Sequence, residues 1–121
     1  MVKALFDTNI LVDYLNAVPQ ARAELQRYEE KAVSIVTWME VMVGASPDLE
    51  AGTRAFLDDF TVVAVDHPIA DRAVNLRRMH RIKLPDAIIW ATAQTRAMLF
   101  VTRNIKDFPQ GDPGVRAPYR L

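Results

Sequence analysis

The 121-residue sequence contains no cysteine, so neither a disulfide framework nor a thiolate metal site is available. No apolar run approaches the roughly 20 residues that a membrane-spanning helix needs. The first apolar run ends at Asp7 and does not resemble a signal peptide. Half of the residues are hydrophobic and a quarter are charged, which is ordinary for a folded chain. We therefore expect one soluble, cytoplasmic domain over residues 1–121.

The formal net charge is zero, but the two halves of the chain differ in sign. Residues 1–60 contain five Lys/Arg and ten Asp/Glu, whereas residues 61–121 contain ten and five. Such an asymmetry is a weak indication that one half meets a charged partner.

Short apolar segments alternate with helical patterns along the chain, which favours a parallel sheet covered on both faces. The predicted strands are residues 2–6, 32–35, 61–65 and 99–101, with at most a short edge strand near Val115. The predicted helices are residues 10–15, 19–30, 37–44, 47–58, 69–82 and 85–97. In such a sheet, ligands bind beyond the carboxyl ends of the strands, where the winding direction reverses. Two strands end in polar clusters there, at residues 7–9 and 102–104.

Two acids stand at the openings of apolar elements. Asp7 closes the first strand, and its ordinary role would be to cap a turn or helix, although Thr8 or Asn9 could do the same. Asp86 follows Pro85 at the start of a helix that is apolar on nearly every side. Asp86 is explained either as a first-turn acid stabilised by backbone N–H groups or as a member of a charged site.

Two further acids are open to the same choice. Glu40 is the only charge between Lys31 and Asp48, and with Thr37 it matches a capping box. Asp107 follows the last predicted strand and would ordinarily be a loop acid paired with a nearby base.

Together the acids suggest one chemistry. Clustered carboxylates repel and stay ionised only if a cation binds between them. Oxygen ligands select hard ions such as Mg²⁺ or Mn²⁺ over zinc. A divalent ion bound there would support hydrolysis of phosphodiester bonds by an activated water.

At these residues the sequence resembles the PIN-domain endoribonucleases, and within them the VapC-type toxins of bacterial toxin–antitoxin pairs. The similar segments occur in the family's order, at residues 6–15, 35–41, 84–89 and 101–108. The resemblance implies an α/β/α sandwich with a central parallel sheet, and Mg²⁺ or Mn²⁺ at an acidic cluster. It also implies an RNA substrate, a homodimer and a small VapB-like antitoxin as partner.

Carried over position by position, the resemblance makes Asp7, Glu40 and Asp86 the metal-site carboxylates, supported by Thr8, Asn9 and Thr102. Many relatives have an acid two residues after this threonine, where the present chain has Asn104. Asp107 is the alternative that would complete the site.

Four cations are candidates for binding RNA phosphates: Arg81, Lys83, Arg103 and Lys106. The first two end a basic segment that leads into the helix of Asp86, and the other two flank Asn104. A solvated helix face is the alternative for the basic segment.

The leading hypothesis is a Mg²⁺-dependent endoribonuclease that acts as a toxin. The alternative is a catalytically weak PIN-like protein that works mainly by binding a partner protein, with Asn104 marking erosion of the site. A phosphate-accepting signalling domain is disfavoured because no acidic pair precedes Asp7.

Overall fold

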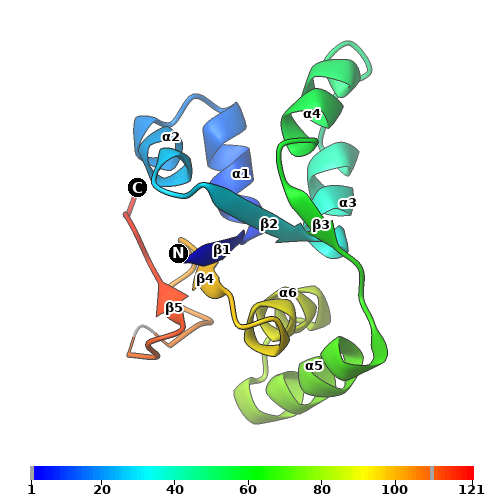
Figure 1. Ribbon diagram of the computed structural model, residues 1–121, viewed down its shortest axis with the longest axis vertical. Coiled ribbons are helices and arrows are strands. Elements are labelled where there is room, and N and C mark those ends of the chain that lie inside the picture. Colours follow the sequence, from blue (N-terminus) through cyan, green and yellow to red (C-terminus); the bar gives the residue numbers. More distant parts are fainter. Residues whose placement is uncertain (1, 110) are drawn as a thin grey trace.

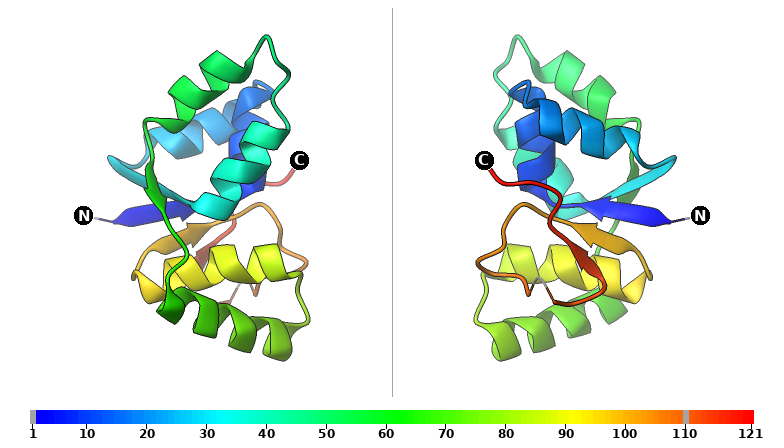
Figure 2. Two further views of the ribbon diagram at one scale, coloured as in Figure 1. Left: turned by 90° about the vertical axis from the view of Figure 1, so that its right-hand side faces the viewer. Right: turned by 90° about the vertical axis from the view of Figure 1, so that its left-hand side faces the viewer.

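The computed structural model describes residues 2–109 and 111–121 and shows a parallel sheet between two layers of helices (Figures 1 and 2). The strands are β1 (Lys3–Phe6), β2 (Glu30–Ser34), β3 (Thr61–Val63), β4 (Leu99–Val101) and β5 (Val115–Arg116). The helices are α1 (Thr8–Leu15), α2 (Pro19–Gln26), α3 (Ile35–Val43), α4 (Glu50–Leu57), α5 (His67–His80) and α6 (Leu84–Thr95).

The strand order is β3-β2-β1-β4-β5, and every pair is parallel. From β1 the chain winds outward on one side to β3, then crosses back to place β4 on the other side of β1. The winding direction therefore reverses between β1 and β4, and their carboxyl ends form the crevice in which such sheets bind ligands. The predicted sheet and α/β/α architecture are confirmed.

Alternate residues of β1 feed two apolar cores. Leu5 belongs to the core under α5 and α6, whereas Ala4 and Phe6 belong to the core under the other helices. Figure 2 shows α5 and α6 on one face of the sheet and α1 to α4 on the other. Because both faces are covered, the central strands are apolar rather than alternating in polarity.

Helix boundaries differ from the prediction in two places that matter. The helix that begins at Pro19 ends at Gln26 rather than Glu30, because Glu30 starts β2 and pairs with Lys3. The helix predicted to open at Thr37 begins at Ile35 instead, and Ser34 caps it by accepting a hydrogen bond from Val36 N at 3.1 Å. The capping box of Thr37 and Glu40 is therefore wrong, which frees Glu40 for another role.

The strands were predicted close to their observed places, including the short edge strand at Val115. Helix α6 also begins with proline near its N-terminus, as expected. Within residues 2–109 and 111–121, no helix combines the length and hydrophobicity that crossing a membrane would require.

Candidate functional site

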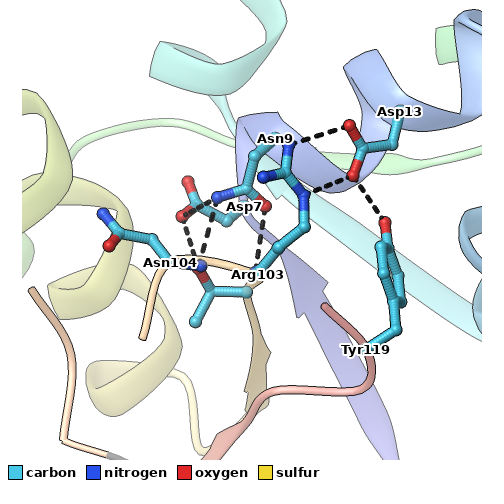
Figure 3. Close-up of polar contacts among 7 residues, drawn as sticks. Asp7, Asn9, Asp13, Arg103, Asn104 and Tyr119 are labelled. Atoms are coloured by element: carbon cyan, nitrogen blue, oxygen red, sulfur yellow. Dashed lines mark hydrogen bonds and ion pairs between the residues drawn. The ribbon is translucent and has the colours of Figure 1, made fainter. Parts of the chain in front are cut away.

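Asp7 lies at the carboxyl end of β1 and is only 4% exposed. Its Oδ1 accepts a hydrogen bond from Thr8 N at 2.8 Å. Its Oδ2 accepts from Thr102 Oγ1 at 2.8 Å and from Asn9 Nδ2 at 3.2 Å. The backbone N–H of Asp7 donates to Val101 O of β4. The buried Asp7 carboxylate, at the reversal point, is thus hydrogen-bonded by residues that follow β1 and by a residue that follows β4 (Figure 3).

Burial is the main reason why the pKa of Asp7 is raised from 3.8 to about 6. Hydrogen bonds from Thr102 and Thr8 lower this pKa, and the charges of Asp86 and Glu40 raise it further. The three groups that donate hydrogen bonds to the Asp7 carboxylate are all uncharged. Among the described residues, Asp7 forms no ion pair with a Lys or Arg.

Glu40 projects from α3 toward the start of α1. Its Oε1 accepts a hydrogen bond from Thr8 Oγ1 at 2.6 Å, and Thr8 Oγ1 is also 3.0 Å from Thr37 Oγ1. The residue that follows Asp7 therefore orients Glu40 as well. Since Oε2 has no hydrogen bond to the described residues, one carboxylate oxygen of Glu40 is left for a ligand.

Asp86 is half-buried in the first turn of α6. Burial is the largest cause of its raised pKa, and the charges of Glu40 and Asp107 raise the pKa further, whereas Lys83 lowers it. The four predicted acids thus influence one another electrostatically: Asp7 with Asp86 and Glu40, and Asp86 with Glu40 and Asp107.

Asn104 and Asp107 close the loop after β4. Asn104 Nδ2 donates to Asp107 Oδ2 at 2.9 Å, and Asn104 Oδ1 accepts from the backbone N–H groups of Lys106 and Asp107, each at 3.2 Å. Both ends of the Asn104 amide are therefore engaged inside the loop. Asp107 keeps Oδ1 without a hydrogen bond to the described residues.

Donor chemistry decides whether a divalent ion fits these residues. Within residues 2–109 and 111–121, no three acidic or histidine side chains stand close enough to ligate one ion together. Mg²⁺ needs only one or two protein carboxylates, however, and keeps several waters. The acids offer oxygen ligands alone, and they raise one another's pKa values where a bound cation would relieve the repulsion. On this chemistry the residues fit a hard divalent ion.

The four predicted RNA-binding cations lie in different surroundings. Arg81 is the left-handed C-cap of α5 (φ 54°), and Lys83 is the N-cap of α6; both are exposed, as is Lys106. Arg103 instead forms a bidentate ion pair with Asp13, with Nε 2.6 Å from Oδ2 and Nη2 2.9 Å from Oδ1.

Two buried acids escaped the sequence analysis. Asp13 on α1 accepts hydrogen bonds from Arg103 and from the Tyr119 hydroxyl, and Glu24 on α2 accepts from Arg116 and the Tyr28 hydroxyl. Isolation from other charges, which singled out Glu40, also marks Asp13, the only charge between Asp7 and Arg22. Glu24 lies between Arg22 and Arg27, so the same criterion would not have found it.

The sequence matches the PIN domain family over residues 4–111. The parallel sheet and the acidic residues at its reversal point agree with that match. The chain therefore belongs to the PIN domain family, and the predicted family is confirmed.

Solved structures with the same fold include chains of toxin–antitoxin complexes. A chain of a toxin–antitoxin complex from Klebsiella pneumoniae is 46% identical, with 98% of this chain and 100% of that chain covered and a TM-score of 0.93. A chain of FitAB bound to a DNA fragment is 25% identical, with 98% and 96% covered and a TM-score of 0.83. A chain of DNA-bound VapBC from Salmonella typhimurium is 24% identical, with 96% of each chain covered and a TM-score of 0.77. No curated protein matches the sequence significantly.

Proposed function

We propose that this PIN domain is a metal-dependent endoribonuclease and the toxin of a toxin–antitoxin pair. The observation that carries the proposal is the group of mutually repelling acids around buried Asp7, at the carboxyl ends of β1 and β4. Acids without a cation partner raise the free energy of the folded chain, and a divalent ion relieves that cost.

Asp7, Glu40 and Asp86 would hold Mg²⁺ or Mn²⁺, directly or through water. A divalent ion bound there supplies polarisation of the phosphate and a lower pKa for the attacking water. Thr102 and Asn9 orient Asp7, and Thr8 orients Glu40, so the carboxylates are fixed before an ion arrives.

Asp107 is our assignment for the fourth acid, in preference to Asn104. The Asn104 carbonyl oxygen already accepts two backbone N–H groups, whereas Asp107 retains a carboxylate oxygen and acts on the pKa of Asp86. Asn104 then serves by holding Asp107 in place.

Exposed Arg81, Lys83 and Lys106 are proposed to bind RNA phosphates. Lys83 acts directly on the pKa of Asp86, which puts its charge beside the acids. Cations beside the acidic site would neutralise RNA phosphates without contacting the bases, so they would raise the affinity for RNA of any sequence.

A small antitoxin is the proposed protein partner. A cavity of about 420 Å³ is lined by residues of α1, α3 and α4, including Val12, Leu15 and Glu40. An antitoxin segment lying there would reach Glu40, and its Arg or Lys could pair with the carboxylates. Homodimerisation and a cytoplasmic location stay predictions.

Cleavage of single-stranded RNA by the purified chain tests the proposal. We expect cleavage that needs Mg²⁺ or Mn²⁺, stops in EDTA, and is lost in Asp7→Asn and Asp86→Asn. Asp58→Asn, at the exposed end of α4, is the matched control and should retain activity. Cleavage that persists in EDTA and in both variants would overturn the nuclease assignment. A chain that binds antitoxin but cleaves no RNA would instead support the partner-binding alternative.

A further inference from the structure

Arg103 is held by α1 at two points. Its backbone N–H donates to Asn9 Oδ1 at 3.1 Å, and its guanidinium makes two hydrogen bonds with Asp13. Asn9 and Asp13 are four residues apart and lie on the same side of the helix. Figure 3 shows the Arg103 side chain reaching along α1 from Asn9 to Asp13.

The Asp13 carboxylate is the fixed end of this contact. Its side chain is 6% exposed, and its Oδ2 also accepts a hydrogen bond from the Tyr119 hydroxyl at 2.8 Å. A buried carboxylate with three hydrogen bonds has one favourable geometry, and removal of a donor leaves charge poorly compensated. Tyr119 thereby joins the C-terminal tail to the same point (Figure 3).

The residues next to Arg103 contact Asp7 directly. Thr102 precedes it in the chain, and Thr102 Oγ1 and Asn9 Nδ2 both donate to Asp7 Oδ2. A shift of residue 103 therefore displaces two of the three groups that orient Asp7. The contacts run from Tyr119 through Asp13 and Arg103 to Thr102 and Asp7.

We propose that Arg103 is a positioning residue, fixed by Asp13 and Tyr119, that sets the orientation of the Asp7 carboxylate rather than binding RNA. The inference rests on the proposed function for its metal and cleavage readouts. Asp13, as a buried partner of Arg103, gains a role that the sequence did not indicate.

The chain supplies a matched control in the second buried ion pair. Arg116 contacts Glu24 with Nε 2.7 Å from Oε2 and Nη2 3.0 Å from Oε1, and Tyr28 OH donates to Oε2 at 2.9 Å. The exposed fractions are 34% and 4%, against 34% and 6% for Arg103 and Asp13. Glu24 and Tyr28 make no hydrogen bond to the residues around Asp7. Arg116 O does accept a hydrogen bond from Thr102 N at 3.0 Å, but this contact belongs to the pairing of β4 with β5 and does not involve the Arg116 side chain. Glu24→Gln and Tyr28→Phe are therefore expected to reproduce the stability cost with little effect on Asp7.

The test compares Mn²⁺ affinity by calorimetry without RNA, kcat and KM for a single-stranded RNA, and melting temperature. We expect Asp13→Asn and Arg103→Gln each to weaken Mn²⁺ binding by about tenfold to a hundredfold. We expect both to lower kcat with little change in KM. The double variant should lose no more kcat or Mn²⁺ affinity than the more impaired of the two single variants. Tyr119→Phe should have the same effect at a smaller size. Arg103→Lys should not restore function, because an ammonium group cannot make the bidentate contact.

Two results would overturn the proposal. In the first, Arg103→Gln raises KM and leaves Mn²⁺ affinity intact, Arg103→Lys restores activity, and Asp13→Asn has no effect. This pattern is that of a lost phosphate contact. In the second, Glu24→Gln weakens Mn²⁺ binding as much as Asp13→Asn does. The loss of Mn²⁺ affinity would then come from lower stability of the fold and not from the orientation of Asp7.

An NMR readout separates this inference from the proposed function. In Asp13→Asn and Arg103→Gln, the backbone amide of Thr8 and the side-chain amide of Asn9 should shift without any metal, and in Glu24→Gln they should not. A wild-type chain that binds no Mn²⁺ would contradict the proposed function, while these amide shifts would still test the positioning. Unshifted amides in a chain that binds Mn²⁺ would contradict the positioning alone.

Discussion

At the scale of single residues, Asp7 is where folding and the proposed function conflict. Its carboxyl is almost fully buried and its pKa is raised to about 6, so at neutral pH the folded chain carries an unfavourable charge. An acid whose pKa is higher in the folded than in the unfolded state binds more protons when folded. The free energy of unfolding therefore falls as pH rises from about 3.8 through about 6, and the loss is complete above that range.

Asp7→Asn should raise the free energy of unfolding of the metal-free protein at neutral pH, because it removes the buried charge, while it abolishes cleavage. A shift of about two pKa units corresponds to roughly 3 kcal/mol. Part of the gain is lost because the new amide NH₂ meets the donors Thr102 and Asn9. The pH dependence is the cleaner signal: relative to wild type, the variant should gain about 1–2 kcal/mol between pH 5 and pH 7.5. Denaturant unfolding in EDTA measures the difference.

Asp58→Asn serves as control, because this side chain is exposed at the end of α4. Its stability relative to wild type should vary little over the same pH range. A stability difference for Asp7→Asn that is the same at pH 5 and pH 7.5 would show that the raised pKa of Asp7 is wrong.

The affinity for Mn²⁺ should depend on the ionisation of the same carboxyl group, Asp7. Since Asp7 binds a cation only after losing its proton, the apparent dissociation constant for Mn²⁺ should rise about tenfold per pH unit below about 6. The raised pKa of Asp86 acts in the same direction. Calorimetric titrations at pH 5, 6, 7 and 8 measure this, and an equal affinity at pH 5 and pH 8 would contradict it.

At the scale of elements, α1 and α3 are linked at the site by Thr8. Thr8→Val keeps the shape of the side chain but removes the 2.6 Å hydrogen bond to Glu40. We expect Mn²⁺ affinity to fall by about tenfold, because supporting hydrogen bonds orient the ligands of a metal.

Thr53→Val is the matched control for this variant. The Thr53 side chain is buried, whereas Thr8 is half-buried, and the Thr53 hydroxyl donates to Leu49 O at 2.9 Å, near the start of its own helix. A Thr8→Val protein that binds Mn²⁺ as tightly as Thr53→Val would show that Thr8 does not orient Glu40.

The sequence predicted the order of the elements well and the start of α3 poorly. Hydrophobic periodicity locates a helix but does not identify its cap, and both Ser34 and Thr37 are suitable cap residues. The choice was decided by β2, which extends to Ser34 through pairing with β3. Local propensity contains no information about that pairing.

Asp13 and Arg103 show a second limit. They are 90 residues apart in sequence, so no local pattern relates them. Arg103 was predicted to bind RNA because it lies beside Asn104, and sequence alone could not show that a buried acid already engages its guanidinium. Exposed Lys106 carries no such competing contact to the described side chains.

At the scale of the whole molecule, the parallel topology brings the two oppositely charged halves of the chain together at one edge. Asp7 and Glu40 come from the acidic first half, and Asp86 and Asp107 come from the basic second half with Lys83 and Lys106. On the proposed function, the fold collects acids that would bind an ion, and cations that would bind phosphates, around the β1–β4 reversal point.

Anomalous diffraction from crystals grown with millimolar Mn²⁺ tests the central claim most directly. We predict a manganese peak at the carboxyl ends of β1 and β4, ligated by Asp7 and by Glu40 or Asp86, directly or through water. A chain that binds manganese elsewhere, or shows no peak beside Asp7, would contradict the account.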